Sequence, residues 1–272
     1  MAKAAIIPDP GIRPAAVAGR FYPSDPVELR ELIRTLLAAV PPAISPPPKA
    51  IISPHAGYLY SGPIAASAHA QFLPVRDWVK RVVVLGPSHF VAIDGVAVSS
   101  AKCFATPLGA VRVDTDAVRQ LRSLRQVELV DEAHAQEHSL EVQLPFLQMV
   151  LGDFSLIPLA AGDASPEEIC EVIEAVWDGA DTRLVVSSDL SHYYDFQTAK
   201  RLDRATADAI EALSPADIGE DQACGRLPIR GLLQSAQRHH LRAHTIDLRN
   251  SGDTAGPRDR VVGYGAFAFA EG

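Results

Sequence analysis

Three short runs of apolar, mostly β-branched residues are each followed by a turn and then by a histidine. The runs cover residues 50–52, 82–85 and 184–186, and the histidines that follow them are His55, His89 and His192. Runs of this kind, closed by Gly, Pro or Ser, are typical of fully buried strands in a parallel sheet. Ligands bind beyond the carboxyl ends of the strands in an open α/β sheet. We therefore expect the three histidines to lie at one edge of a sheet.

Other segments carry the period of a strand or of a helix. Strand patterns occupy residues 95–99, 110–114, 126–130, 154–159, 244–248 and 261–270. Helix patterns follow the capping pairs Asp25-Pro26 and Ser165-Pro166, and others cover residues 139–151, 201–213 and 228–237. Alternating strands and helices predict an α/β fold with a mostly parallel central sheet flanked by helices. The proline-rich residues 41–48 are short enough to be a connection, so we expect residues 1–272 to form a single domain.

The net charge and the cysteine content indicate which partners and which cellular compartment to expect. The formal net charge of the 272 residues is −8, which argues against nucleic-acid and anionic-membrane partners. No stretch approaches the length of a membrane span, and Pro8 interrupts the N-terminal segment before an apolar signal region develops. Three cysteines without a C-x-x-C pair fit a reducing compartment. We expect a cytoplasmic protein.

Cys224 is a further candidate metal ligand beside the histidines. A single histidine near a strand end is usually structural, but its recurrence after three strands favours a shared site. Imidazole suits iron, copper, zinc and nickel, and a thiolate adds a soft ligand. Cys224 directly precedes a helical pattern, and Arg226 follows it two residues later. Both features lower the pKa of a thiol, so we expect Cys224 to be a thiolate that binds metal or acts as a nucleophile.

His192 also has the surroundings expected of a general acid/base. Asp189 lies three residues before it on the same turn. A carboxylate beside an imidazole fixes its tautomer and raises its basicity. We therefore predict catalytic roles for His192 and Asp189.

A competing motif lies at residues 134–138. His134-Ala135-Gln136-Glu137-His138 matches H-x-x-E-H, the inverted zinc-protease signature, and predicts a zinc metallohydrolase if both histidines lie on one helix face. The regular helical pattern begins only near Ser139, which weakens this interpretation. The other interpretation is that Glu137, His138 and Glu141 line a wall of the pocket or cap the following helix.

Several sequence blocks together resemble the Memo family in order and spacing. The resemblance runs from about Val17 to Phe269, and the blocks are AGRFYP (18–23), PHAGYLYSG (54–62), GPSH (86–89), TPLG (106–109), EHSLE (137–141), SSDLSH (187–192), CGRLPI (224–229) and VGYGA (262–266). Many blocks in one order are far more specific than any single motif.

The resemblance implies a fold similar to class III extradiol dioxygenases, in which two histidines and one glutamate hold iron(II). Memo-like chains have cysteine in place of that glutamate. Carried over to this sequence, the metal ligands are His55, His89 and Cys224, and His192 takes the place of the acid/base. The reasoning from strand ends reached the same four residues.

The resemblance also frames the expected function. It implies an iron(II)- or copper-dependent oxidoreductase, in which we expect Tyr58, Glu141 and His138 to position the substrate. The alternative is a non-catalytic module that binds a peptide or partner in the same cleft. The family further implies an AMMECR1-type protein and a radical-SAM protein as partners, with an unidentified small-molecule or peptide ligand.

Overall fold

A mixed β-sheet runs through the whole molecule. The computed structural model describes residues 11–272. The strands of the sheet are β1 (Ile12–Arg13), β2 (Ala50–Ser53), β3 (Arg81–Pro87), β4 (Val96–Val98), β5 (Cys103–Thr106), β6 (Gly109–Val113), β7 (Val127–Leu129), β8 (Ser155–Ala161), β9 (Thr182–Ser187), β10 (His192–Tyr194), β11 (Leu241–Asn250) and β12 (Val261–Glu271). Their main path is β1-β5-β6-β8-β3-β9-β2-β12-β10, with β4 and β7 beside β8 and β11 beside β12.

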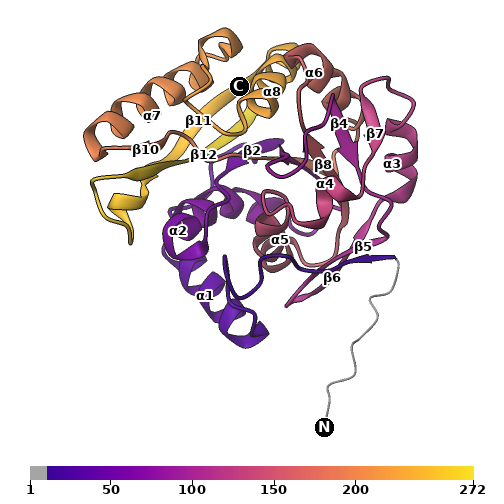
Figure 1. Cartoon of the computed structure of the whole chain (residues 1–272), viewed down its shortest axis with the longest axis horizontal. Helices are drawn as coiled ribbons and strands as arrows, with labels where there is room; N and C mark the ends of the chain where they lie inside the picture. The colour runs from indigo at the N-terminus through magenta and orange to yellow at the C-terminus, as the bar shows by residue number, and fades with distance from the viewer. Residues whose placement is uncertain (1–10) are drawn as a thin grey trace.

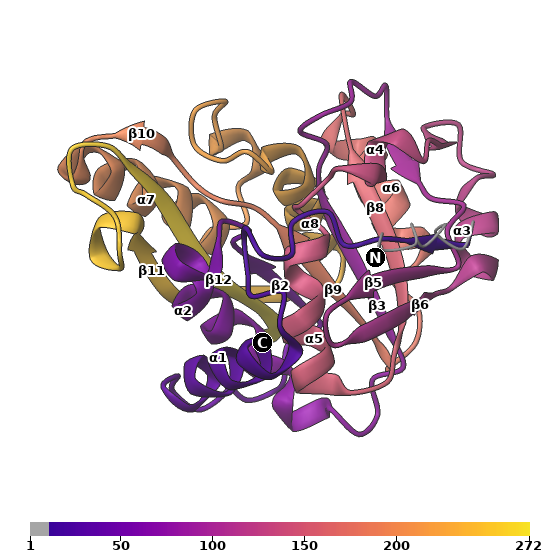
Figure 2. The same ribbon diagram turned by 60° about the horizontal axis from the view of Figure 1, so that its bottom comes forward.

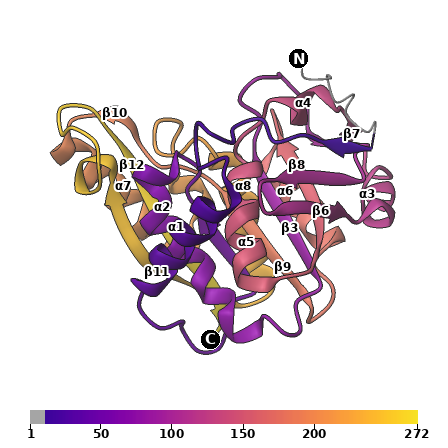
Figure 3. The same ribbon diagram turned by 90° about the horizontal axis from the view of Figure 1, so that it is seen from below.

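Helices cover both faces of this sheet. They are α1 (Pro26–Ala38), α2 (Tyr58–His69), α3 (Thr115–Leu121), α4 (Glu132–Ala135), α5 (Leu144–Leu151), α6 (Pro166–Ala175), α7 (Phe196–Glu211) and α8 (Arg226–Arg238). Figure 1 shows α6, α7 and α8 on one side of the sheet and α1, α2 and α5 on the other. Figure 3 shows the second group side by side. The predicted α/β fold, with a mostly parallel sheet flanked by helices, is confirmed.

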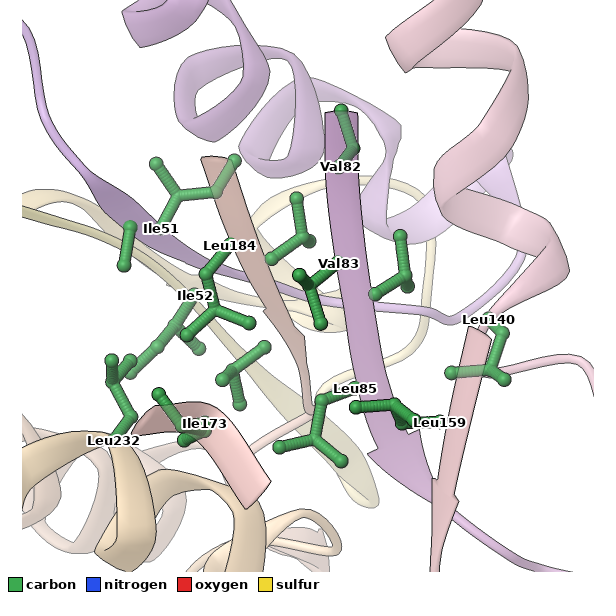
Figure 4. Close-up of a cluster of buried hydrophobic side chains, with 14 of the residues drawn as sticks. Ile51, Ile52, Val82, Val83, Leu85, Leu140, Leu159, Ile173, Leu184 and Leu232 are labelled. Carbon is green, nitrogen blue, oxygen red and sulfur yellow. The ribbon is translucent and has the colours of Figure 1, made fainter. Parts of the chain in front are cut away.

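The three predicted histidine-bearing strands are neighbours at the centre of the sheet. β9 lies between β3 and β2 and is parallel to both. Their side chains are buried on both faces, as the uninterrupted apolar runs predicted. Figure 4 shows Val83, Leu85 and Leu184 of these strands packed with Ile173 and Leu232 from the helices. Because the strands run in one direction, their carboxyl ends meet at one edge.

Antiparallel pairs close the two ends of the sheet. β12 pairs antiparallel with β2, β11 and β10. At the other end, β5 pairs antiparallel with β6. Figure 2 shows these two ends at opposite sides of the molecule. Within residues 11–272, no helix is both long enough and apolar enough to cross a membrane.

Capping residues explain where several helices begin. The Asp25 side chain accepts hydrogen bonds from the first turn of α1, and Ser165 forms a complete capping box with Glu168 at α6. α7 begins five residues earlier than predicted because the Asp195 side chain caps it. The predicted 139–151 helix is instead a 3-10 turn, η2 (Glu141–Gln143), that leads into α5.

The sequence did not predict α2. Most of this helix is buried, between the sheet and the layer formed by α1 and α5. Ile64, Ala65 and Ala66 point to different sides and are all buried. A helix without a polar face has no amphipathic period, so its type cannot be read from the pattern of hydrophobic residues.

The contact between α6 and α8 leaves no room for a side chain at Gly231. A Cβ atom at this position would lie 2.2 Å from Ile169 Cγ2 and 3.1 Å from the Cys170 backbone nitrogen. We expect Gly231→Ala to lower the free energy of unfolding by about 1–3 kcal/mol through overpacking. Urea denaturation measures this change.

The exposed variant Arg238→Ala, on the same helix, is the control and should change the free energy of unfolding by less than about 0.5 kcal/mol. Alanine is a better helix former than glycine by about 1 kcal/mol. An unchanged or increased stability of Gly231→Ala would therefore contradict the close packing.

Candidate metal centre

Two of the predicted histidines meet at the carboxyl edge of the central strands. His55 follows β2 and His89 follows β3, while β9 lies between these strands. The centroids of the two rings are 5.2 Å apart and the rings meet edge to face. The convergence predicted for this pair is therefore confirmed.

His138 supplies a third imidazole. It lies in the loop after α4, and its ring centroid is 5.3 Å from that of His55 and 4.7 Å from that of His89. One ring nitrogen from each of the three residues lies within 4.8 Å of the others, so this group could hold a metal ion. The sequence predicted His138 as a residue that positions the substrate, not as a member of the metal-binding group.

Cys224 lies next to this histidine cluster. Its Sγ atom is 3.3 Å from His55 Nε2 and 3.6 Å from the Asp189 carbonyl oxygen. The cysteine stands two residues before α8, and Gly225 packs against Ser188 after β9. The predicted thiol therefore contacts one histidine of the cluster, although it is not part of the three-imidazole group.

The hydroxyl group of Ser187 determines the tautomer of His55. This hydroxyl donates its hydrogen to the Ser139 carbonyl oxygen at 2.6 Å and accepts a hydrogen bond from Gln143 Nε2 at 2.8 Å. It has no further hydrogen to donate, so the 2.9 Å contact with His55 Nδ1 requires that Nδ1 be the donor. The lone pair of His55 Nε2 then faces Cys224, which is the state needed to bind a metal ion.

Glu137 orients His89 in a similar way. Its two carboxylate oxygens accept hydrogen bonds from His89 Nδ1 at 2.9 Å and from the His89 backbone at 2.6 Å. One of them also accepts from the backbone nitrogens of His138 and Ser139. Burial raises the pKa of Glu137, but the hydrogen bonds from His89 outweigh it and lower the pKa to about 2. The carboxylate is ionised and leaves His89 Nε2 available.

Burial also controls the protonation of the candidate ligands. It lowers the pKa of His55 well below its usual value, and the neighbouring His89 and His138 lower it further. Burial likewise lowers the pKa of His138 to about 4. Both rings are neutral at pH 7, as metal ligands must be.

The prediction of a low pKa for Cys224 is wrong for the metal-free protein. Burial, followed by the charge of Asp189, raises the pKa of the thiol to about 12. Arg226, which was expected to stabilise a thiolate, instead lies 3.5 Å from Glu220. The cysteine is therefore a neutral thiol that must lose its proton before it can bind a metal ion.

His192 and Asp189 lie together but are not joined as the sequence predicted. Asp189 Oδ1 accepts a hydrogen bond from the His55 backbone nitrogen at 2.8 Å, so this carboxyl group holds the His55 loop and does not orient the His192 ring. Burial raises the pKa of Asp189. His192 is instead positioned by the pairing of β10 with Val262 of β12.

A pocket of about 390 Å³ opens beside the cluster. Its lining includes His138, Asp189, His192, Tyr60 and Arg260. The pocket therefore joins the predicted acid/base to the histidine cluster, on the side where a substrate can enter.

Tyr58 and Glu141 do not line this pocket, so their predicted role in positioning substrate does not fit their surroundings. Tyr58 is buried and donates to the Val142 carbonyl oxygen at 2.7 Å. Glu141 is fully buried, forms an ion pair with Arg13, and accepts from Tyr22 and from the backbone nitrogens of Ala16 and Val17. These contacts anchor the N-terminal segment.

The geometry required by the H-x-x-E-H motif is absent from residues 134–138. α4 ends at Ala135, so His134 and His138 do not share a helix. His134 is buried, its Nε2 lies 3.2 Å from the Ala97 carbonyl oxygen, and it is outside the histidine cluster. The Glu137 carboxylate accepts a hydrogen bond from His89 and none from His134. The zinc-metallohydrolase interpretation therefore lacks its structural basis.

Sequence reasoning missed two residues that support the histidine cluster and gave a third a different role. Ser187 and Gln143 were assigned no role, although their hydrogen bonds fix the His55 ring. Glu137 was expected to line the pocket or to cap the following helix, whereas its carboxylate orients His89. This pairing could not be read locally, because the two residues are 48 positions apart in the sequence.

Comparisons with known proteins find relatives over nearly the whole chain. The family model described as Memo-like protein matches residues 13–268. A MEMO1 family protein of Methanopyrus kandleri is 34% identical, with 96% of this chain and 99% of that protein covered. MEMO1 family proteins of Archaeoglobus fulgidus and Aquifex aeolicus are 35% and 32% identical, each with 95% of this chain and 99% of the relative covered.

The carboxylate of Glu137 leads to a prediction about metal affinity. In Glu137→Gln the side chain keeps one accepting oxygen, but its NH₂ group cannot accept a hydrogen bond from His89 or from the backbone. We expect the affinity for iron(II) to fall roughly 10- to 100-fold, as is usual when the partner of a metal-ligating histidine is removed. Anaerobic titration against a competing chelator measures it.

Glu132→Gln is the matched control, because Glu132 lies on α4 in the same segment but is exposed. Its affinity for iron(II) should equal that of the wild type. If Glu137→Gln also kept the wild-type affinity, Glu137 would not orient a metal ligand.

Proposed function

The chain belongs to the Memo family, and from this membership and the geometry of the site we propose that it is an iron(II)- or copper-dependent oxidoreductase. His55, His89 and Cys224 are the proposed ligands, and His192 is the proposed acid/base. One observation carries the proposal. The unprotonated Nε2 of His55 faces Cys224 Sγ at 3.3 Å, beside the ring of His89.

The donor set fits such a metal. Two imidazoles and one thiolate are ligands that both iron and copper accept, and they leave coordination positions open for a substrate. Ser187 and Glu137 hold the two rings through their Nδ1 atoms, which is the usual support for metal-ligating histidines. When bound, the metal would supply one-electron redox chemistry and a Lewis acid at the end of the pocket.

The protein's own groups perform the remaining tasks. The pocket lined by Tyr60, His138 and Arg260 binds the substrate. His192 lies on the same wall and exchanges a proton with the substrate at a ring nitrogen. The neighbouring Asp189 carboxyl group is buried and accepts a hydrogen bond from the His55 backbone nitrogen. This contact fixes the bottom of the pocket.

His138 is the alternative third ligand. If the metal binds three neutral imidazoles, binding releases no thiol proton. If it binds Cys224, the thiol, whose pKa is about 12, must lose its proton. The two ligand sets therefore differ in the number of protons released.

We expect wild-type protein purified without oxygen to contain iron or copper and to release about one proton per metal ion bound between pH 7 and 9. Since the thiol is protonated throughout this range, the apparent affinity should rise about tenfold per pH unit. Calorimetric titration in buffers of different ionisation enthalpy measures the protons, and elemental analysis measures the metal.

Cys224→Ser should lose the metal or the proton release, whereas Cys170→Ser should retain both. Cys170 is a matched control because it is buried and contacts Ser235 far from the cluster. Metal binding without proton release in the wild type would assign His138 as the third ligand. Wild-type protein without any metal would leave the pocket as a non-catalytic binding site.

The acid/base role of His192 has a separate test. We expect His192→Gln to keep its metal but to lower oxygen consumption with catechol roughly 10²- to 10⁴-fold, because proton transfer loses its donor. An oxygen electrode measures the rate. His244→Gln, exposed on β11, is the control and should retain the wild-type rate. A full rate in His192→Gln would remove this residue from the mechanism.

A further inference from the structure

A second pocket lies at the opposite end of the central strands. It has a volume of about 430 Å³ and is lined by residues that include Lys49, which precedes β2, and Arg183, near the start of β9. The histidine cluster follows the other ends of these strands. A six-residue strand rises roughly 20 Å, so the two sites are well separated. Glu271 lines the pocket, so the C-terminal label in Figure 3 marks this end of the sheet.

Flat apolar groups form much of the wall. The chain has two tryptophans, and both Trp78 and Trp177 line this pocket. The ring of Trp177 stacks on His239, with centroids 4.2 Å apart and an interplanar angle of 13°. Trp78 is 55% exposed, an unusual position for a large apolar side chain. This wall suits a planar ligand.

A buried and a half-buried cation lie under the same pocket. Arg183 is only 7% exposed; its Nη1 donates to the carbonyl oxygens of Ala180 and Thr182. Its Nε is buried and has no hydrogen-bond partner in residues 11–272. Lys49 donates to the carbonyl oxygens of Trp177 and Gly179 and lies over the Trp177 ring.

The charge of these two residues is not neutralised by an ion pair. Asp178 and Glu271 line the pocket, but within residues 11–272 no carboxylate lies within ion-pair distance of Lys49 or Arg183. Burial, and then the positive charge of Arg183, lower the pKa of Lys49 to about 8, although the nearby charges of Asp181 and Asp178 act in the opposite direction. Two like charges held close together without a direct ion pair repel each other, and a bound anion would reduce this repulsion.

We propose that this pocket binds a small organic anion with a planar apolar body, of the class of aromatic carboxylates. The carboxylate lies against Lys49, with the positive charge of the buried Arg183 beside it, and the apolar body lies against the two tryptophans. The volume is that of a small-molecule site, and the donors are already in place before the ligand binds. The proposal does not depend on the metal centre.

The two tryptophans report directly on this site. Titration of the full chain with 3-phenylpropionate, which does not absorb at 295 nm, should change the tryptophan fluorescence in a saturable way. The uncharged 3-phenylpropionamide should bind roughly tenfold or more weakly, because it offers no charge to the two cations. Equal affinity for the two compounds, or no saturable change with either, would overturn the proposal.

Substitutions then locate the anion. Lys49→Gln and Arg183→Gln should each weaken binding of 3-phenylpropionate roughly tenfold or more. Lys80→Gln is the matched control, since Lys80 is exposed at the same end of the sheet but does not line the pocket, and it should bind as the wild type does. If Arg183→Gln fails to fold, Lys49→Gln carries the test. Wild-type affinity in Lys49→Gln, or an equal loss in Lys80→Gln, would contradict the assignment.

Discussion

The in-register parallel pairing of β3, β9 and β2 is the constraint on which the structure depends. Val83 pairs with Leu184 and Ile52 pairs with Val186, so the backbone hydrogen bonds of three buried strands are satisfied by their neighbours. This pairing fixes the height at which each strand ends. His55 and the Asp189 loop therefore emerge beside His89, and a shift of one residue in any strand would turn its buried side chains to the wrong face.

Buried polar groups convert this edge into a defined site. Ser187 ends β9, and its hydroxyl group connects the His55 ring with the loop at Ser139. Glu137 connects the same loop with His89. Arg13 holds the segment from the other side, because it donates to the backbone oxygens of His134 and Glu137 and pairs with Glu141. Removing one partner of such a buried ion pair is strongly unfavourable, so the N-terminal strand and the loop that carries Glu137 and His138 are coupled.

The two ends of the central strands have opposite electrostatic character. At the carboxyl edge, burial keeps His55 and His138 neutral and Cys224 protonated, and a metal cation would be the charge that this donor set accepts. At the amino edge, Lys49 and Arg183 bring positive charge under an aromatic wall. One sheet thus has an edge that could hold a metal cation and, as we propose, an edge that binds an anion, because different loops follow and precede the same strands.

The sequence by itself determined the fold class, the central strands and the capped helices α1 and α6, since these depend on local period and local hydrogen bonds. It also indicated that His55 and His89 converge, because parallel strands must end together. It could not reveal α2, which has no polar face, or the role of Glu137, whose partner His89 is 48 residues away. The protonation of Cys224 and the contacts of Tyr58, Glu141 and Asp189 were likewise decided by burial. Desolvation and long-range hydrogen bonds exist only once the chain has folded, so neither can be predicted from the local sequence around a residue.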